Sequence, residues 1–428
     1  MKQGSVFFIA FRYLLGRGKE GGRYLRGAAI GIAVSMVPIV VTLVVADGMI
    51  QGITDRYLEL GTYHAQISIR QSAADPRPAK LAALEVPDVR GVWAERQGLG
   101  IVLGKGVSSG AAVRAVEPSF LEDEGVRKYL NPTLGVLSLN SPGDALIGEE
   151  LARKTGLALG DTVRLMTARS TQDGRIIPKT ALFTVRGIVS SGYRELDALW
   201  FFISYDDGLR FLPPESSRAF LGVKMDDPYV GMNAVTAGIE RTLPKGYFLT
   251  GWYDLQKSQY RSYQSTRQLL LFIMAIIVIV AAVNVSSATS MLAVERRRDI
   301  AILKSFGADP GGSTRVFLFG ALLTGLSGSI LGLSAGVLVA VNINTIIHFL
   351  ESALVLVSTF GTMVGGNSLS VPVKLLDPAY YLQEIPITID WGALALIGTG
   401  TILCSVLTAW APARRAGKLM PLEILRKY

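Results

Sequence analysis

The chain has 428 residues, of which 50% are apolar and 18% charged, and its formal net charge is +9. Charged residues make up about a quarter of a typical soluble domain, so this composition excludes an ordinary soluble enzyme and an intrinsically disordered chain. A single cysteine, Cys404, excludes a disulfide framework within one chain. The two histidines, His64 and His348, lack the spacing of metal ligands, and we expect both to be structural.

Four long apolar runs predict membrane helices. At about 1.5 Å per residue, each run is long enough to cross a hydrocarbon core of roughly 30 Å. The predicted helices span residues 28–47, 268–294, 316–348 and 390–411. The first run is longer than the usual signal-peptide core of about 7–15 residues, so we interpret it as an uncleaved anchor. Gly31 and Ser35 in this helix would permit close approach to a second helix.

Basic residues are concentrated in three segments outside these helices, namely residues 1–27, 295–315 and 412–428. The segment at residues 349–389 contains a single basic residue, Lys374. Because cytoplasmic segments are enriched in Lys and Arg, both termini and the 295–315 segment are predicted to be cytoplasmic. The short 349–389 loop and the long 48–267 segment then lie on the outer side. The positive net charge is therefore an orientation signal and not the footprint of a nucleic-acid-binding surface.

The 48–267 segment has the composition of a soluble domain. Alternation of apolar and polar residues, or enrichment in β-branched and aromatic residues, predicts strands at His64–Arg70, Thr162–Met166, Ala181–Val189, Leu199–Tyr205, Arg218–Met225 and Tyr247–Thr250. Helices are predicted at Gly148–Gly156, 228–242 and 254–267, the last continuing into the second membrane helix. The predicted fold is an α-helical membrane protein with four transmembrane helices and a large α+β domain inserted between helices 1 and 2.

Residues that carry catalysis are not arranged in a recognisable pattern. The sequence contains no His-Glu-x-x-His motif and no P-loop of the form Gly-x-x-x-x-Gly-Lys-Ser/Thr. The adjacent acids Glu149–Glu150 and Asp226–Asp227 are expected to be solvated, because neighbouring positions point in different directions. The chain is therefore predicted not to be an enzyme, and any ATP that it uses is expected on another chain.

The cytoplasmic segment contains a short amphipathic stretch. Residues 295–307 read Glu-Arg-Arg-Arg-Asp-Ile-Ala-Ile-Leu-Lys-Ser-Phe-Gly. Ile300 with Leu303, and Ile302 with Phe306, form helical i,i+3 and i,i+4 pairs, and Gly307 is placed to end the helix. Such a helix either lies on anionic lipid or docks into a partner protein.

This stretch resembles the coupling helix of ABC permeases of the lipoprotein-releasing, cell-division and macrolide-efflux types. The resemblance assigns contact with an ATPase to Glu295, Arg297, Arg298, Ile300, Ile302, Leu303, Lys304, Phe306 and Gly307. The tail is similar to the family ending at Pro412–Ala416 and Pro421–Arg426. Further similarity, at Phe8–Leu14, Asp47–Arg56 and Tyr380–Asp390, is to the lipoprotein-releasing permeases, the LolC/LolE family within the FtsX/MacB-type superfamily.

The resemblance implies a permease subunit of the inner membrane with a periplasmic outer domain. It would pair with a second permease, identical or related, and with a dimer of cytoplasmic ABC ATPases. ATP and magnesium are expected on the ATPase, and no cofactor is expected on this chain. The complex would extract lipoproteins from the inner membrane and pass them to a periplasmic lipoprotein carrier.

A loop in the outer domain resembles a contact site for that carrier. Between two predicted strands lies Arg169–Lys179, with a tight-turn signal at Asp173-Gly174. Lipoprotein-releasing permeases have a hook loop at this place that recruits the carrier. The resemblance assigns carrier binding to Gly174, Arg175, Ile176, Ile177 and Pro178. An ordinary hairpin loop is the alternative interpretation.

Other functions are open on the sequence alone. A macrolide-efflux permease usually has its own N-terminal ATPase, for which the 27 residues before the first predicted helix leave no room. A cell-division permease has a much smaller outer domain. Another export or signalling task of the same permease type is the principal alternative, and a membrane-anchored enzyme is the alternative from a different class.

Overall fold

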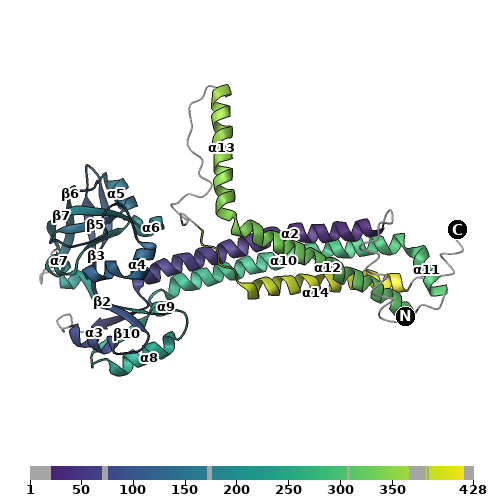
Figure 1. The fold of residues 1–428 in the computed structure, drawn as a ribbon, viewed down its shortest axis with the longest axis horizontal. Helices are drawn as coiled ribbons and strands as arrows, with labels where there is room; N and C mark the ends of the chain where they lie inside the picture. Colours follow the sequence, from purple (N-terminus) through teal and green to yellow (C-terminus); the bar gives the residue numbers. More distant parts are fainter. Residues whose placement is uncertain are drawn as a thin grey trace. The chain divides into compact units, whose positions relative to one another are not determined.

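The computed structural model describes residues 21–69, 76–170, 176–305, 309–365, 382 and 385–418 (Figure 1). The chain divides into two compact units. The helical unit comprises Met1–Gly48, Tyr263–Val357 and Pro386–Tyr428, and the sheet unit comprises Met49–Ser262 and Ser358–Ile385. Each unit therefore combines segments that are far apart in sequence.

Four described helices are long and apolar enough to cross a membrane. They are α2 (Gly21–Arg56), α10 (Lys257–Glu295), α12 (Pro310–Val341) and α14 (Trp391–Gly417). Each contains one of the apolar runs of the sequence. The predicted continuity between residues 254–267 and the second run is confirmed from Lys257 onward, since α10 includes both.

The third apolar run is divided between two helices. The sequence predicted one helix to residue 348 and then a loop, whereas α12 ends at Val341 and α13 (Ile343–Gly365) begins after one intervening residue. Asn342 between them leaves helical geometry, with φ −97° and ψ 14°, and its side-chain amide donates to the carbonyl of Leu338 at 2.8 Å. Hydropathy does not mark this break, because the residues on both sides of it are apolar.

Small residues allow α12 to lie directly against α2. Gly328, Gly332 and Gly336 recur every fourth residue and form one ridge of α12. A Cβ atom at Gly332 would lie 2.7 Å from Cβ of Met36, and one at Gly336 would lie 2.7 Å from Cβ of Val40. Glycine at these positions permits an approach that a larger residue would block.

Gly31 does not take part in such packing among the described residues of this chain. Apart from its own helix backbone, no described atom lies within 4 Å of the place where its Cβ would be, and the Ser35 hydroxyl donates to the Gly31 carbonyl within the same helix. The side of α2 that packs against α12 instead carries Ile32 and Met36, both fully buried.

The sheet unit contains a ten-stranded sheet. The strands are β1 (Ala65–Ile69), β2 (Val89–Leu103), β3 (Ser108–Val116), β4 (Asn131–Gly135), β5 (Asp144–Gly148), β6 (Thr162–Ser170), β7 (Ile176–Ser190), β8 (Trp200–Ser204), β9 (Ser217–Met225) and β10 (Tyr247–Gly251). Their order is β10-β1-β9-β2-β3-β8-β5-β7-β4, and β6 pairs with both β2 and β7. Because β6 joins β2 to β7, the strands β2, β3, β8, β5, β7 and β6 form a closed barrel, from which β9, β1 and β10 continue as an open layer.

Short helices cover these strands (Figure 1). They are η1, a π-helix (Tyr57–Thr62), α3 (Arg77–Leu84), η2 (Pro118–Glu122), α4 (Glu124–Tyr129), α5 (Glu149–Thr155), α6 (Arg194–Asp197), α7 (Tyr205–Phe211), η3 (Pro214–Ser216), α8 (Met232–Thr242) and α9 (Trp252–Leu255). One apolar core fills the barrel and includes Val113, Val163 and Phe201. A second core lies between the open layer and the helices α3 and α8, and includes Ile67, Ala83 and Ile239.

The strands predicted from the sequence are present as β1, β6, β7, β8, β9 and β10, with ends shifted by a few residues. The helices predicted at Gly148–Gly156 and 228–242 are confirmed as α5 and α8. The strands β2 to β5 were not predicted. The mixed α+β character of the 48–267 segment is thereby confirmed, although its sheet is more extensive than expected.

Candidate functional site

The predicted coupling stretch forms helix α11 (Arg297–Ser305), which follows α10 after a break at Arg296. One side of α11 packs onto the helical unit. Ile300 is 3% exposed and lies in an apolar cluster with Leu25, Phe317 and Ala416. The Lys304 ammonium donates to the carbonyl of Gly417 at 2.5 Å, so α11 is attached to the end of α14.

The opposite side of α11 is open. Ile302 is 40% exposed, and Arg298 is also exposed. Glu295 is the last residue of α10. The structure does not describe the side chains of Arg297 and Leu303, and Phe306 and Gly307 lie outside the described residues, as does the tail motif Pro421–Arg426. Among the predicted coupling residues whose side chains are described, Arg298 and Ile302 are therefore the exposed ones, whereas Ile300 and Lys304 hold the helix in place.

The predicted carrier-binding segment belongs to a β-hairpin. β6 and β7 pair in antiparallel fashion, with Ala168 opposite Pro178 and Ser170 opposite Ile176. The sequence had suggested that Ile176, Ile177 and Pro178 lie in a loop. In the structure they are strand residues of β7. A proline argues against a strand, which is why this segment was assigned to a loop. A proline is tolerated here because, among the described strands, this end of β7 pairs with β6 alone and its other edge is open.

Part of the predicted hook is open to solvent. Ile177 is 51% exposed and Pro178 is exposed. Gly174 and Arg175 lie outside the described residues, and the side chain of Ile176 is not described. An exposed isoleucine beside an exposed proline on a hairpin is suited to contact with another protein.

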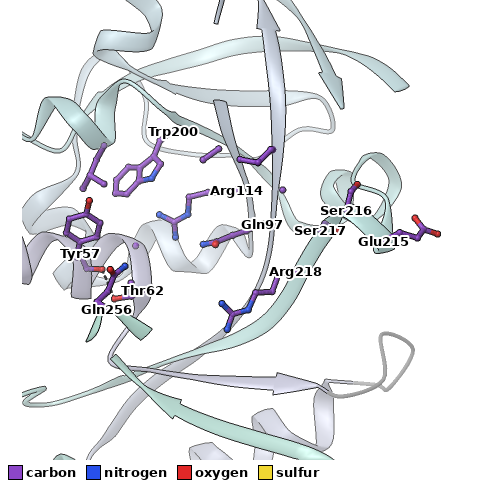
Figure 2. Close-up of a pocket in the computed structure, with 15 residues that line it drawn as sticks. Tyr57, Thr62, Gln97, Arg114, Trp200, Glu215, Ser216, Ser217, Arg218 and Gln256 are labelled. Carbon is purple, nitrogen blue, oxygen red and sulfur yellow. Dashed lines mark hydrogen bonds between the residues drawn. The ribbon is translucent and has the colours of Figure 1, made fainter. Parts of the chain in front are cut away.

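A pocket of about 620 Å³ lies in the sheet unit (Figure 2). This volume is within the roughly 300–1,000 Å³ typical of ligand sites. Its labelled lining residues in Figure 2 include Tyr57, Gln97, Arg114, Trp200, Arg218 and Gln256. They come from η1, β2, β3, β8, β9 and the residue before α10, so the pocket is assembled from segments that are distant in sequence. No motif in the sequence indicated it.

Arg114 forms the inner wall of this pocket. It is 2% exposed, and its Nε and Nη2 donate to the two carboxylate oxygens of Glu95 at 2.7 and 2.8 Å. Its Nη1 donates to the carbonyl of Leu60, and the rings of Trp200 and Phe202 lie 5.0 Å from the guanidinium carbon. Burial alone would lower the pKa of Arg114, but the Glu95 carboxylate raises it. Arg114 is therefore held in one place by hydrogen bonds from three of its nitrogens.

A second buried charge attaches η1 to the sheet. Lys224 on β9 has no solvent exposure, and its ammonium lies 2.8 Å from the Glu59 carboxylate and 2.6 Å from that of Asp123. Arg90 donates to Asp123 at 2.6 Å. His64 accepts from the amide of Met225 at 2.9 Å and lies 3.3 Å from Glu59, so the prediction of a structural His64 is confirmed.

Charge pairing sets the ionisation of Asp123. Burial would raise the pKa of this carboxyl, but the hydrogen bonds and charges of Lys224 and Arg90 hold it below its usual value. The group is therefore ionised at neutral pH. Removing Lys224 would leave Glu59 and Asp123 without the buried ammonium that they share, whereas removing either carboxylate would leave Lys224 with one of its two carboxylate partners.

In the helical unit, one arginine joins three segments. Nε of Arg267 on α10 lies 2.8 Å from the Asp47 carboxylate on α2, and Nη2 lies 3.2 Å from that of Asp390. Asp390 also caps α14 by accepting from the amide of Ala393 at 3.0 Å. These bonds hold together the ends of α2, α10 and α14.

One of the two acid pairs differs from the prediction. Asp226 and Asp227 are exposed, as predicted, but Glu150 is only 6% exposed. Its carboxylate accepts from Arg153 at 2.9 and 2.8 Å and from Arg194 at 2.8 Å. Although burial raises the pKa of Glu150, these two arginines lower it overall. No sequence pattern indicated the contact with Arg194, which is distant along the chain.

Two stretches match the pattern Gly-x-Ser-x-Gly, at residues 106–110 and 332–336. A nucleophile elbow requires a sharp turn from a strand into a helix. The first stretch is the turn that leads into β3, and the second is inside α12. Neither has the geometry of a hydrolase nucleophile.

Comparison with known proteins assigns the chain to a family. The MacB-like periplasmic core domain matches residues 27–242, and the FtsX-like permease C-terminal domain matches residues 271–421. The lipoprotein-releasing system transmembrane protein LolC of Xylella fastidiosa is 26% identical, over 98% of both chains. The chain belongs to the LolC/LolE family of the FtsX/MacB permease superfamily.

Other relatives of the LolC/LolE family agree over the same length. LolC of Neisseria meningitidis serogroup B is 25% identical over 98% of both chains, and LolE of Haemophilus influenzae is 23% identical over 99% of this chain and 100% of that one.

The solved periplasmic region of MacB from Actinobacillus actinomycetemcomitans covers 46% of this chain and 94% of its own, at 15% identity and a TM-score of 0.30. That score is too low to support a fold assignment.

Proposed function

We propose that this chain is a permease subunit of an ATP-driven ABC transporter that extracts lipoproteins from the inner membrane and passes them to a periplasmic carrier. The observation that carries this proposal is similarity to LolC and LolE over the whole chain, through both domains in order. Four apolar helices fit a permease. A lipoprotein needs such a machine because exposing its acyl chains to water costs about 0.8 kcal/mol per CH₂ group.

The proposed topology places both termini and α11 in the cytoplasm and the sheet unit in the periplasm, inserted between the first two membrane helices. It rests on the basic residues around 295–315 and at both ends of the chain. ATP and magnesium would bind to a separate ATPase dimer, and a second permease subunit would complete the membrane part. The β6–β7 hairpin would bind the carrier through Arg175, Ile177 and Pro178.

Coupling to the ATPase is proposed to occur through the open side of α11. Ile302 and Arg298 are exposed there, whereas Ile300 and Lys304 fix the helix to the helical unit. ATP-driven movement of a docked ATPase would thus be transmitted to α14 and its neighbours.

The test is an ATP-driven release assay on the complete complex with the double variant Arg298→Glu, Ile302→Asp. We expect lipoprotein release to fall at least about tenfold, since charge reversal and burial of a carboxylate both oppose docking. Lys418→Glu is the matched control, because it reverses an exposed charge at the end of α14 and should retain release. Normal release by the double variant, with the ATPase still bound, would contradict the coupling role of α11.

A further inference from the structure

The pocket of the sheet unit has a lining that matches a polypeptide backbone. Gln97 and Gln256 contribute side-chain amides (Figure 2), each with a donor and an acceptor like those of a peptide group. Nε2 of Gln97 already donates to Glu95 at 2.7 Å, which leaves its oxygen as an acceptor. The rings of Tyr57 and Trp200 lie on the same side of the pocket as Gln256, and Arg114 lies between Trp200 and Gln97 (Figure 2). A purely apolar acyl chain would leave the amides unpaired.

One cation in the pocket is open to a ligand. Arg114 is neutralised by its paired bonds to Glu95. Arg218, by contrast, is exposed, with a long 3.5 Å bond to Ser68 Oγ, and Figure 2 shows Glu215 directed away from it. A single open guanidinium suits a backbone carbonyl or a side-chain carboxylate better than a phosphate group, which commonly recruits several cations.

One large apolar side chain of β2 also lines the pocket. Leu99 lies between the part of β2 that pairs with β9, as far as Gly98, and the part that pairs with β6, from Ile101, and its carbonyl accepts from the Thr167 hydroxyl at 3.1 Å. Its backbone is therefore held by β6, whereas its side chain is 78% exposed, more than any other large apolar side chain in the described ranges. An exposed leucine in a pocket suits contact with an apolar side chain of a ligand.

The pocket is continuous in the chain with two apolar helices. Tyr57 is the residue directly after α2, and Gln256 is the residue directly before α10. A substrate that is held in the membrane by its acyl chains presents its polypeptide where such helices end. This favours the substrate, and not a soluble carrier, as the source of the peptide.

We propose that this pocket binds an extended segment of the substrate's polypeptide, with Leu99 contacting a side chain, the amides of Gln97 and Gln256 pairing with its backbone, and Arg218 binding a carbonyl or carboxylate. The inference rests on the proposed function and adds a polypeptide contact to acyl-chain extraction. It makes the sheet unit a part of substrate selection.

The test is site-specific photo-crosslinking in the complete complex with a lipoprotein substrate in the membrane. A benzophenone amino acid replaces Leu99 in one variant and Val107 in the control, which is 55% exposed and outside the pocket lining. The expected result is a substrate adduct at position 99 and none at position 107. Equal adducts at both positions, no adduct, or an adduct at position 99 with the carrier alone would overturn the proposal.

A charge variant separates this inference from the proposed function. Arg218→Glu should reduce release by about fivefold, whereas Lys245→Glu, which reverses an exposed charge outside the pocket, should not. ATP-dependent release by the unmodified complex supports the proposed function whatever the variants do. If Arg218→Glu and Lys245→Glu both release lipoprotein as well as the unmodified complex does, the peptide site is refuted and the proposed function is not. If the unmodified complex itself releases no lipoprotein, the proposed function is refuted.

Discussion

Lys224 and its partners show how single residues hold the short helix η1 onto the sheet. A lysine without solvent exposure is stable only when carboxylates and rings replace its water. Glu59 and Asp123 supply the carboxylates, and the ring of Phe120 lies 5.3 Å from the ammonium. Glu59 belongs to η1, so this cluster fixes η1 to the strand β9 within the sheet unit.

This cluster predicts a loss of stability in acid. The pKa of Asp123 is lowered in the native state, so its contribution to stability is fully present above its unfolded value of about 3.9 and is lost as the pH falls through the lowered native pKa. Urea unfolding of the full chain in detergent, followed by tryptophan fluorescence, should show a falling free energy of unfolding below about pH 4. Trp93, 5.8 Å from the Lys224 ammonium, provides a nearby signal.

The control for this prediction is Asp123→Asn. At neutral pH it should be less stable by about 2 kcal/mol, the usual value of a hydrogen bond to a charged group. Its stability should depend less on pH between about pH 4 and pH 2, since the titrating group is gone. An equal acid dependence in both proteins would assign the effect to other carboxylates.

At the scale of elements, the glycine ridge of α12 predicts a specific packing defect. Gly332→Leu would place a branched side chain where Met36 and Ala33 of α2 already lie, since even a Cβ would be 2.7 and 3.0 Å away. Overpacking of this kind costs typically about 1–3 kcal/mol. The melting temperature of the detergent-solubilised protein should therefore fall.

Gly31→Leu is the matched control for this defect. It makes the same change on α2, where no atom lies within 4 Å of the would-be Cβ, and glycine is a poor helix former. The melting temperature should be unchanged or higher. A larger loss in Gly31→Leu than in Gly332→Leu would show that α2 and α12 pack through other faces.

The elements found from the sequence are those with a periodic pattern. Long apolar runs mark the four membrane-length helices, and alternation marks β1 and β9. β2 was missed because Glu95 and Arg96 lie in its middle and are both buried, so the apolar pattern is interrupted where the ion pair with Arg114 forms. β4 was missed because all its residues are exposed and one is proline.

The two candidate sites also differ in how far the sequence predicts them. The amphipathic pattern of 295–307 predicted α11, yet only the structure separates exposed Ile302 from buried Ile300. The pocket had no signal at all, because Tyr57, Arg114 and Gln256 are brought together by sheet pairings across the whole domain. Sequence patterns report one element at a time, whereas a pocket depends on the contacts between elements.

At the scale of the whole molecule, each part is proposed to carry out one step. α11 would receive movement from the ATPase, the four apolar helices would shelter acyl chains, and the sheet unit would bind the polypeptide and the carrier. The Arg267 bonds to Asp47 and Asp390 connect three of the helix ends within the helical unit. Whole-chain similarity to LolC and LolE is the common basis for these roles.

The most direct test is release of a radiolabelled lipoprotein from vesicles that contain this chain with its native partners. The lipoprotein is expected to leave the vesicles and enter the soluble fraction only when ATP and a purified periplasmic carrier are both present. Replacing ATP with a non-hydrolysable analogue should abolish release. Retention of the lipoprotein in the vesicles with ATP and carrier present, in a complex that hydrolyses ATP, would contradict the central claim.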